Sequence, residues 1–91
     1  MTYNLIYTNS YIKRASKFAK QHPDLLPQYE KTLKILEIDP NHPSLRLHSL
    51  KGKLKDLHTI SINISYRITL EFIIIKKEII LVNVGHHDEV Y

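Results

Sequence analysis

Residues that can move protons or bind phosphate stand at the end and in the middle of the chain. The sequence ends in GHHDEVY, which includes His86, His87 and Tyr91, and its middle holds His48 and Arg67. Histidine titrates near neutral pH, a tyrosine phenol can donate a proton, and arginine forks onto phosphate oxygens. Metal-free cleavage of RNA needs a base for the 2′-OH, an acid for the leaving 5′ oxygen and a cation for the charged phosphorane. These five residues offer all three kinds of group.

Two other chemistries are disfavoured by residue spacing. The consecutive residues His86, His87, Asp88 and Glu89 are all of metal-ligating types. Neighbouring residues of a strand point to opposite faces, so the two histidines would converge only at a turn. We therefore expect no metal, and nothing in the sequence calls for another cofactor. A serine hydrolase is disfavoured because no serine has the flanking glycines of a nucleophile elbow.

Simpler interpretations of the same residues stay open. The tail could be a frayed terminus whose Tyr91 packs on the edge of a sheet. Arg67 could form a surface ion pair with Glu71, which would contribute at most about 1 kcal/mol and would leave it able to bind phosphate. His22 and His42 adjoin prolines, and we expect both to be solvated loop residues.

A basic cluster precedes the last third of the chain. The whole sequence has 13 Lys and Arg against 9 Asp and Glu, a net charge of +4. Four of these cations crowd together: Arg46, Lys51, Lys53 and Lys55. This distribution favours a polyanionic partner such as nucleic acid. The alternative is an edge strand that lysines protect from aggregation.

Length and composition set the class of protein. With 91 residues, of which 43% are hydrophobic and 24% charged, we expect residues 1–91 to form a single domain. The sequence has no cysteine, which excludes disulfides and a thiol nucleophile and favours the cytoplasm. No apolar run approaches the roughly 18 residues of a membrane span, so we expect no membrane association.

The first half of the chain predicts a strand and two helices. Residues 3–7 are aromatic and branched, as in a strand. Apolar residues then recur at helical spacing from Ser10 to the break at Pro23: Tyr11, Ile12, Ala15, Phe18 and Ala19. A second helix is expected from a cap at Asp24, with Pro27 in its first turn, and it ends before Pro40.

The second half alternates with the period of two that strands require. The three inward sets are Ile60, Ile62 and Ile64; then Tyr66, Ile68, Leu70, Phe72 and Ile74; then Ile80, Val82 and Val84. We expect an antiparallel meander from them. The predicted fold is therefore α+β, of order β-α-α-β-β-β, with a four-stranded antiparallel sheet and two helices on one face.

Short loops would set the register of this meander. A hairpin loop at residues 76–78 would place Arg67 opposite His87, and a loop at residues 63–65 would place Ser61 opposite Arg67. Ser61, Arg67 and His87 would then form a row on the face away from the helices. Cross-strand neighbours lie about 5 Å apart, so a phosphate could bridge the guanidinium and the imidazole.

Two stretches resemble a known protein family. LHSLKGKLKDLHTISINISYRITLEF and ILVNVGHHDEVY are similar to the RelE/ParE superfamily of toxins from type II toxin–antitoxin systems, closest to the YafQ-like and RelE-like mRNA interferases. The resemblance covers the second half of the chain well. The first half agrees only in the order of its elements.

The resemblance implies roles for particular residues. His48 matches the histidine before the LKG segment of YafQ-like toxins, and His87 and Tyr91 match the histidine and the aromatic residue of their C-terminus. Arg67 matches the arginine that RelE-like members place against the scissile phosphate. Ser61 and Ser65, however, stand where YafQ-like toxins have a histidine and an aspartate, and neither serine is a good acid or base.

Three interpretations of this incomplete set remain. His48, His87 and Tyr91 suffice with Arg67 as electrophile, His86 substitutes for a missing group, or the chain is a weakened or differently tuned member of the superfamily.

The activity implied is metal-independent, ribosome-dependent cleavage of mRNA, giving a 2′,3′-cyclic phosphate and a 5′-hydroxyl. The basic cluster would bind ribosomal RNA, and an acidic antitoxin would be the protein partner in a toxin–antitoxin hetero-oligomer. One alternative is a ParE-like toxin that inhibits DNA gyrase by binding alone, and another is an inert or merely antitoxin-binding relic. The alternatives differ in whether replacing His87 and Tyr91 abolishes toxicity.

Overall fold

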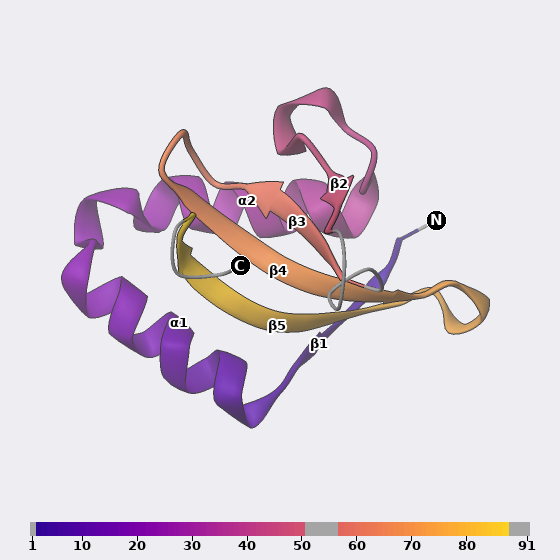
Figure 1. Ribbon diagram of the computed structural model, residues 1–91, viewed down its shortest axis with the longest axis horizontal. Helices are drawn as coiled ribbons and strands as arrows, with labels where there is room; N and C mark the ends of the chain where they lie inside the picture. Colours follow the sequence, from indigo (N-terminus) through magenta and orange to yellow (C-terminus); the bar gives the residue numbers. More distant parts are fainter. Residues whose placement is uncertain (1, 51–56, 88–91) are drawn as a thin grey trace.

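The computed structural model describes residues 2–50 and 57–87, which form a sheet with two helices packed on it (Figure 1). The elements in chain order are β1 (Asn4–Tyr7), α1 (Asn9–Gln21), α2 (Leu26–Ile38), β2 (His48–Ser49), β3 (His58–Ser61), β4 (Tyr66–Ile73) and β5 (Glu78–His86). The predicted α+β class and the strand–helix–helix–meander order are confirmed.

The sheet is mixed and has five strands, in the order β1-β5-β4-β3-β2. The prediction of four antiparallel strands was wrong in two respects. β1 pairs in parallel with β5, from Asn4 opposite Glu78 to Tyr7 opposite Leu81. The additional strand, β2, has only two residues and pairs antiparallel to β3. Both pairings follow from tertiary packing that no local pattern reveals.

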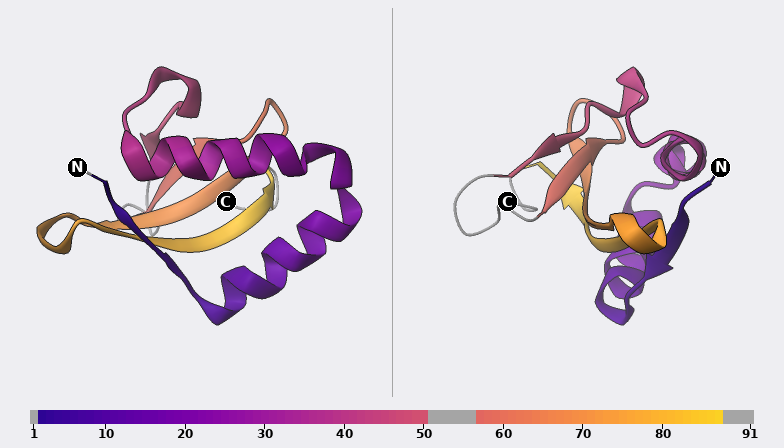
Figure 2. Two further views of the ribbon diagram at one scale, coloured as in Figure 1. Left: turned by 180° about the vertical axis from the view of Figure 1, so that it is seen from behind. Right: turned by 90° about the vertical axis from the view of Figure 1, so that its right-hand side faces the viewer.

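Both helices cover the same face of the sheet, as predicted (Figure 2). Thr8 caps α1 by accepting a hydrogen bond from the backbone N–H of Tyr11. Pro27 lies in the first turn of α2 as expected, but the predicted cap at Asp24 was wrong. Asp24 belongs to a short 3₁₀ turn, and Leu25 takes the cap position without a side-chain hydrogen bond.

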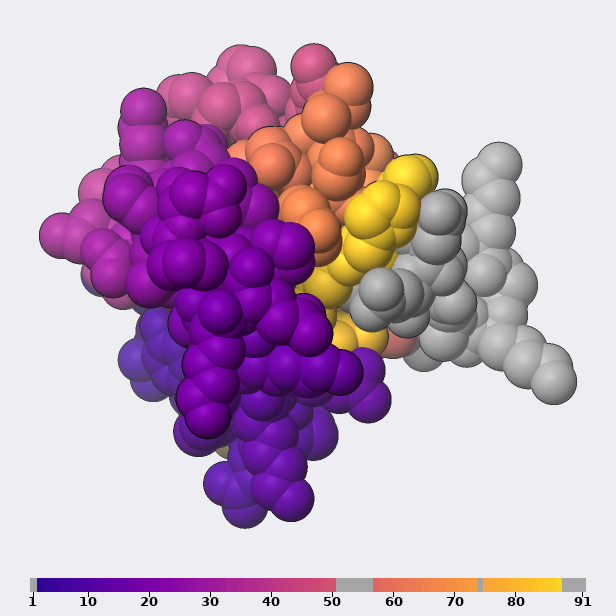
Figure 3. Space-filling model, turned by 90° about the vertical axis from the view of Figure 1, so that its left-hand side faces the viewer, coloured from indigo at the N-terminus to yellow at the C-terminus, as the bar shows by residue number. Residues whose placement is uncertain are grey.

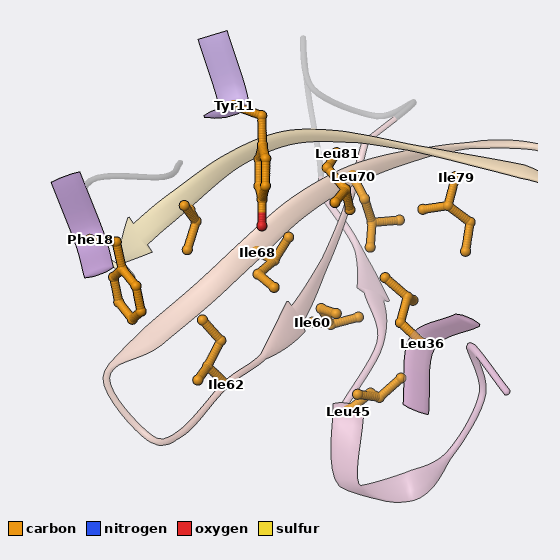
Figure 4. Close-up of a cluster of buried hydrophobic side chains, with 11 residues drawn as sticks. Tyr11, Phe18, Leu36, Leu45, Ile60, Ile62, Ile68, Leu70, Ile79 and Leu81 are labelled. Carbon is orange, nitrogen blue, oxygen red and sulfur yellow. The ribbon is translucent and has the colours of Figure 1, made fainter. Parts of the chain in front are cut away.

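The core lies between this face and the helices (Figure 4). Its fully buried side chains include Leu36 of α2, Ile68 and Leu70 of β4, and Leu81 of β5. Tyr11 is also fully buried, and its hydroxyl lies 2.7 Å from that of Tyr29. This hydrogen bond satisfies a polar group that would otherwise be costly to bury.

The hairpin between β4 and β5 differs from the prediction and changes the register. Its connection contains a 3₁₀ turn from Ile74 to Lys76, followed by Lys77 in the left-handed region at φ 52°. Ile73 therefore pairs with Glu78 rather than with Leu81. A bulge then adds Val82 on β5, because Thr69 pairs with Asn83 while Leu70 pairs with Leu81.

The bulge also changes which residues of β5 face the helices. Ile79 and Leu81 are fully buried, whereas Ile80 and Val82 are half-buried, so the predicted alternation is wrong in this part of the strand. Val84, beyond the bulge, is buried as predicted. The additional residue, Val82, restores the predicted orientation toward or away from the helices for the residues that follow it in β5.

Candidate active site

Arg67 is held on the face of the sheet away from the helices. Ser61 lies opposite Arg67, as predicted, and its Oγ accepts a hydrogen bond of 2.9 Å from the Nη1 of Arg67. The Nε of Arg67 is buried and has no hydrogen-bond partner. Within residues 2–50 and 57–87 no ion pair joins Arg67 to Glu71. The guanidinium is thus fixed by a neutral group, and among the described residues no carboxylate neutralises its charge.

Arg67 lines a hollow of about 230 Å³ that lies at the end of β3 and the start of β4. Its lining includes Ser44, Arg46, Ser61, Asn63 and Arg67, and none of the lining residues is acidic. Two arginines without a carboxylate give the hollow a positive potential. We name it the arginine hollow. Its charge and hydroxyl groups suit a phosphate group.

Arg46 reaches this hollow from an unusual backbone conformation. It follows the short 3₁₀ helix Pro43–Leu45 with φ 50° and ψ 46°, in the left-handed region. A residue with a Cβ pays roughly 1–2 kcal/mol to occupy that region. A glycine would occupy it without this cost, so an arginine here is consistent with a functional use of its side chain.

His48 lies on the same face as Arg67. Its partner across the strands is Thr59, two residues before Ser61, and residues two apart on a strand share a face. The imidazole Nε2 lies 3.2 Å from the Thr59 hydroxyl, and Nδ1 lies 3.3 Å from the Arg46 carbonyl oxygen. His48 is exposed. The structure therefore places an accessible imidazole on the same face as the guanidinium, with β3 between the two strands that carry them.

His87 does not lie opposite Arg67, so the predicted pairing was wrong by two residues. Arg67 faces Gly85, and the backbone N–H of His87 donates a hydrogen bond of 2.8 Å to the carbonyl oxygen of Ser65. The cause is the β4–β5 connection, which shifts the register by three residues before the bulge reduces the shift to two. The row of Ser61 and Arg67 therefore continues to a glycine.

The two neighbouring histidines converge, contrary to the expectation for a continuing strand. β5 ends at His86, and the chain turns at His87, so the ring centroids lie 4.4 Å apart. His86 pairs with Tyr66, and their rings meet edge to face at 5.6 Å. In the described ranges, no group of three or more His, Cys, Asp or Glu residues is placed to hold a metal.

His22 is a site residue that sequence reasoning missed. We expected a solvated loop residue, but His22 is half-buried, with its ring 4.6 Å from Tyr66 and 5.1 Å from Phe18. Its position four residues after Phe18 places it on the same side of α1, and this spacing was the available signal.

Other predicted residues lie outside the described part of the chain. They are Lys51, Lys53, Lys55 and Tyr91, together with Asp88 and Glu89 of the disfavoured metal site. Across the residues that are described, no helix has the length and apolar character to cross a membrane.

The sequence matches no family model and no curated protein, but the structure resembles solved toxins. A copper-bound mutant toxin from Helicobacter pylori is 25% identical, with a TM-score of 0.72 and 98% of this chain and 99% of that chain covered. YafQ from Escherichia coli gives a TM-score of 0.80 at 12% identity, covering 98% of both chains. The chain has the RelE/ParE toxin fold.

The RelE/ParE fold also occurs in a toxin bound to its antitoxin. The DinJ–YafQ complex of E. coli matches with a TM-score of 0.79 at 14% identity, over 100% of this chain and 99% of that chain. Coverage at this level means that the RelE/ParE resemblance extends over the first half, where the sequence pattern indicated only the order of elements.

Proposed function

We propose that the protein is the toxin of a toxin–antitoxin pair and cleaves mRNA at the ribosome, in the cytoplasm. The reaction is attack of a ribose 2′-oxygen on the adjacent phosphorus with loss of the 5′-oxygen. It yields a 2′,3′-cyclic phosphate and a 5′-hydroxyl without a metal. His48, His87 and Tyr91 are the proposed acid–base groups, with His86 as the alternative, and Arg67 is the proposed electrophile.

The observation that carries the proposal is the environment of the Arg67 guanidinium. Its guanidinium is fixed by Ser61, has no carboxylate partner among the described residues, and shares the arginine hollow with Arg46. Charge develops on the phosphoryl oxygens as the phosphorane forms, and a preorganised cation there lowers the barrier without reorganising. The exposed imidazole of His48 on the same face supplies a titratable group within the same surface.

Ser61 has a different task from the residue it replaces. It stands where YafQ-like toxins have a histidine, and it is hydrogen-bonded to Arg67. We propose that Ser61 is a positioning residue for the guanidinium, and that acid–base chemistry depends on His48 and the C-terminal histidines. The absence of the histidine that YafQ-like toxins have at this position would then leave Arg67 able to stabilise the negative charge of the phosphorane.

Binding partners follow from the charge of the protein. We propose that Arg46, Lys51, Lys53 and Lys55 dock on ribosomal RNA, and that an antitoxin covers the same basic surface before release. Electrostatic docking of this kind weakens steeply with salt. Because Arg46 lines the arginine hollow, it would contribute to binding at the scissile phosphate as well as to docking.

The test is induced expression with mapping of mRNA 5′ ends. We expect growth arrest and new 5′-hydroxyl ends from the wild type. Arg67→Ala, His48→Ala and His87→Ala should each lose both, and Lys34→Ala, at an exposed residue of α2 that lines neither hollow, is the control. Toxicity in all variants without new RNA ends would refute the nuclease and favour the gyrase-binding alternative, which a supercoiling assay on purified gyrase would then detect.

A further inference from the structure

A second hollow lies on the other side of the same end of the sheet. It measures about 420 Å³ and lies between α1 and the adjoining ends of β4 and β5. Figure 3 views this side, with α1 in purple beside the orange start of β4 and the yellow end of β5. We name it the helix hollow. Its volume is within the range of roughly 300–1,000 Å³ typical of small-ligand sites.

Aromatic and imidazole rings gather in the wall of the helix hollow. The Tyr66 ring contacts His22 at 4.6 Å, Phe18 at 5.4 Å and His86 at 5.6 Å between centroids. Tyr66, His22 and His86 are half-buried, so part of each ring remains accessible. Such surfaces stack on nucleic-acid bases, which all have a π face.

Two cations border the same wall. Arg14 and Lys17 are three residues apart on α1, both are exposed, and both line the helix hollow. None of the residues that line it is acidic, and α1 contains no acidic residue. A ligand here would therefore meet positive charge beside flat rings. A nucleotide, with a phosphate joined to an aromatic base, combines both complementary groups.

The position of the helix hollow identifies the kind of nucleotide. Tyr66 and Arg67 are consecutive on β4, so they point to opposite faces, one into the helix hollow and the other into the arginine hollow. A polymer that occupies the arginine hollow can pass around this end of the sheet. A short single strand of RNA can do so, because its unstacked bases are free to turn outward.

We propose that the helix hollow binds one nucleotide of a single-stranded RNA. Its base lies against Tyr66 and His22, and its phosphate is bound by Arg14 and Lys17. The inference rests on the proposed function for the polymer at the arginine hollow, and it adds a second subsite that binds RNA away from the reacting phosphate.

Equilibrium binding of a fluorescent RNA hexamer tests the proposal. With 2′-O-methyl groups throughout, the probe cannot undergo 2′-oxygen attack, so the assay measures affinity alone. The double variant Arg14→Ala/Lys17→Ala should bind at least about tenfold more weakly than the wild type. The matched control Lys13→Ala/Lys20→Ala removes the same charge from the same helix, but neither residue lines the helix hollow. We expect the control to weaken binding by about twofold or less.

Further measurements separate stacking from charge. The slope of log affinity against log salt should fall by about 0.7 in the site variant, for one lost phosphate contact on a single strand. An abasic hexamer should bind the wild type at least about fivefold more weakly than the normal one. Equal losses in the site and control variants, or equal affinity for the abasic probe, would overturn the proposal.

The expression experiment and the hexamer-binding experiment together distinguish failure of the proposed nuclease activity from failure of the proposed subsite. If the protein is no nuclease but the helix hollow binds RNA, expression produces no new RNA ends while the hexamer still distinguishes the two double variants. If the nuclease proposal holds and the subsite does not, cleavage appears and the two double variants bind the hexamer equally.

Discussion

Replacing Ser61 tests directly whether its hydrogen bond holds the guanidinium of Arg67 in place. Ser61→Ala removes the Oγ that accepts from Nη1 at 2.9 Å, at a residue with 9% of its surface exposed. A hydrogen bond to a charged group contributes roughly 1.5–3 kcal/mol. Arg67 is half-buried and can turn partly into water after the substitution, so we expect a loss of about 1–2 kcal/mol in the free energy of unfolding.

Urea and thermal unfolding measure this loss. For a chain of this size, each 1 kcal/mol lowers the Tm by roughly 4–8 °C, so the expected shift is about 4–16 °C. Ser49→Ala, at an exposed serine of β2, is the matched control and should change stability by less than about 0.5 kcal/mol. A double-mutant cycle with Arg67→Ala should recover a coupling energy of about 1 kcal/mol or more.

Two results would contradict the reasoning. If Ser61→Ala and Ser49→Ala cost the same, the hydrogen bond contributes nothing measurable. If Ser61→Ala is additive with Arg67→Ala, the two side chains act independently. In the nuclease assay, Ser61→Ala should also lower the cleavage rate, and Ser61→Thr, which keeps the hydroxyl, should restore most of it. Failure of that rescue would exclude positioning of Arg67 as the role of Ser61.

Four further outcomes follow from the described contacts. Tyr29→Phe should cost about 1–3 kcal/mol in urea unfolding, because the fully buried hydroxyl of Tyr11 loses its partner. Burial raises the pKa of Tyr11 above the ordinary value of 10.0. Stability should therefore fall as the pH rises through that value, where the unfolded chain releases protons that the folded chain retains, and Tyr11→Phe should weaken the dependence. Leu81→Ala, at a fully buried position, should cost about 2–5 kcal/mol in the same assay. Arg46→Gly should change the unfolding free energy by less than about 1 kcal/mol, since relief at φ 50° offsets the added chain entropy, while lowering affinity for the RNA hexamer.

The helices and the central strands could be predicted because their signals are local. The helical spacing of Tyr11 and Phe18 and the alternation of Ile68 and Leu70 both correspond to buried faces. The pairing of Ser61 with Arg67 was also predicted, because a short loop between strands of known facing allows few registers.

Other parts of the fold depend on contacts between distant residues. The parallel pairing of Asn4 with Glu78 joins residues from opposite ends of the chain and has no signature in either strand alone. The β4–β5 connection was misread because Lys77 occupies the left-handed region without being a glycine. The error in that loop then displaced His87 from its predicted partner.

The candidate site was predicted in composition more than in arrangement. The sequence pattern placed Ser61 and Arg67 together on the face away from the helices, and the structure confirms that pairing. His48 was a candidate only through the family resemblance, and its pairing with Thr59 puts it on the same face. The sequence pattern did not indicate that Arg46 would line the arginine hollow, because this depends on the left-handed conformation of Arg46 itself in an irregular segment. The contact between His22 and Tyr66 likewise arises where α1 packs on the sheet.

The bulge at Val82 decides which residue of β5 lies opposite Tyr66. With Val82 present, His86 takes that place beneath the helices. A regular ladder without the bulge, continued from Ile73 opposite Glu78 and Leu70 opposite Leu81, would bring Gly85 opposite Tyr66 instead. The same regular ladder would place Val84, in place of Gly85, opposite Arg67. A single irregular position in β5 therefore sets which side chains meet at the end of the sheet that carries both hollows.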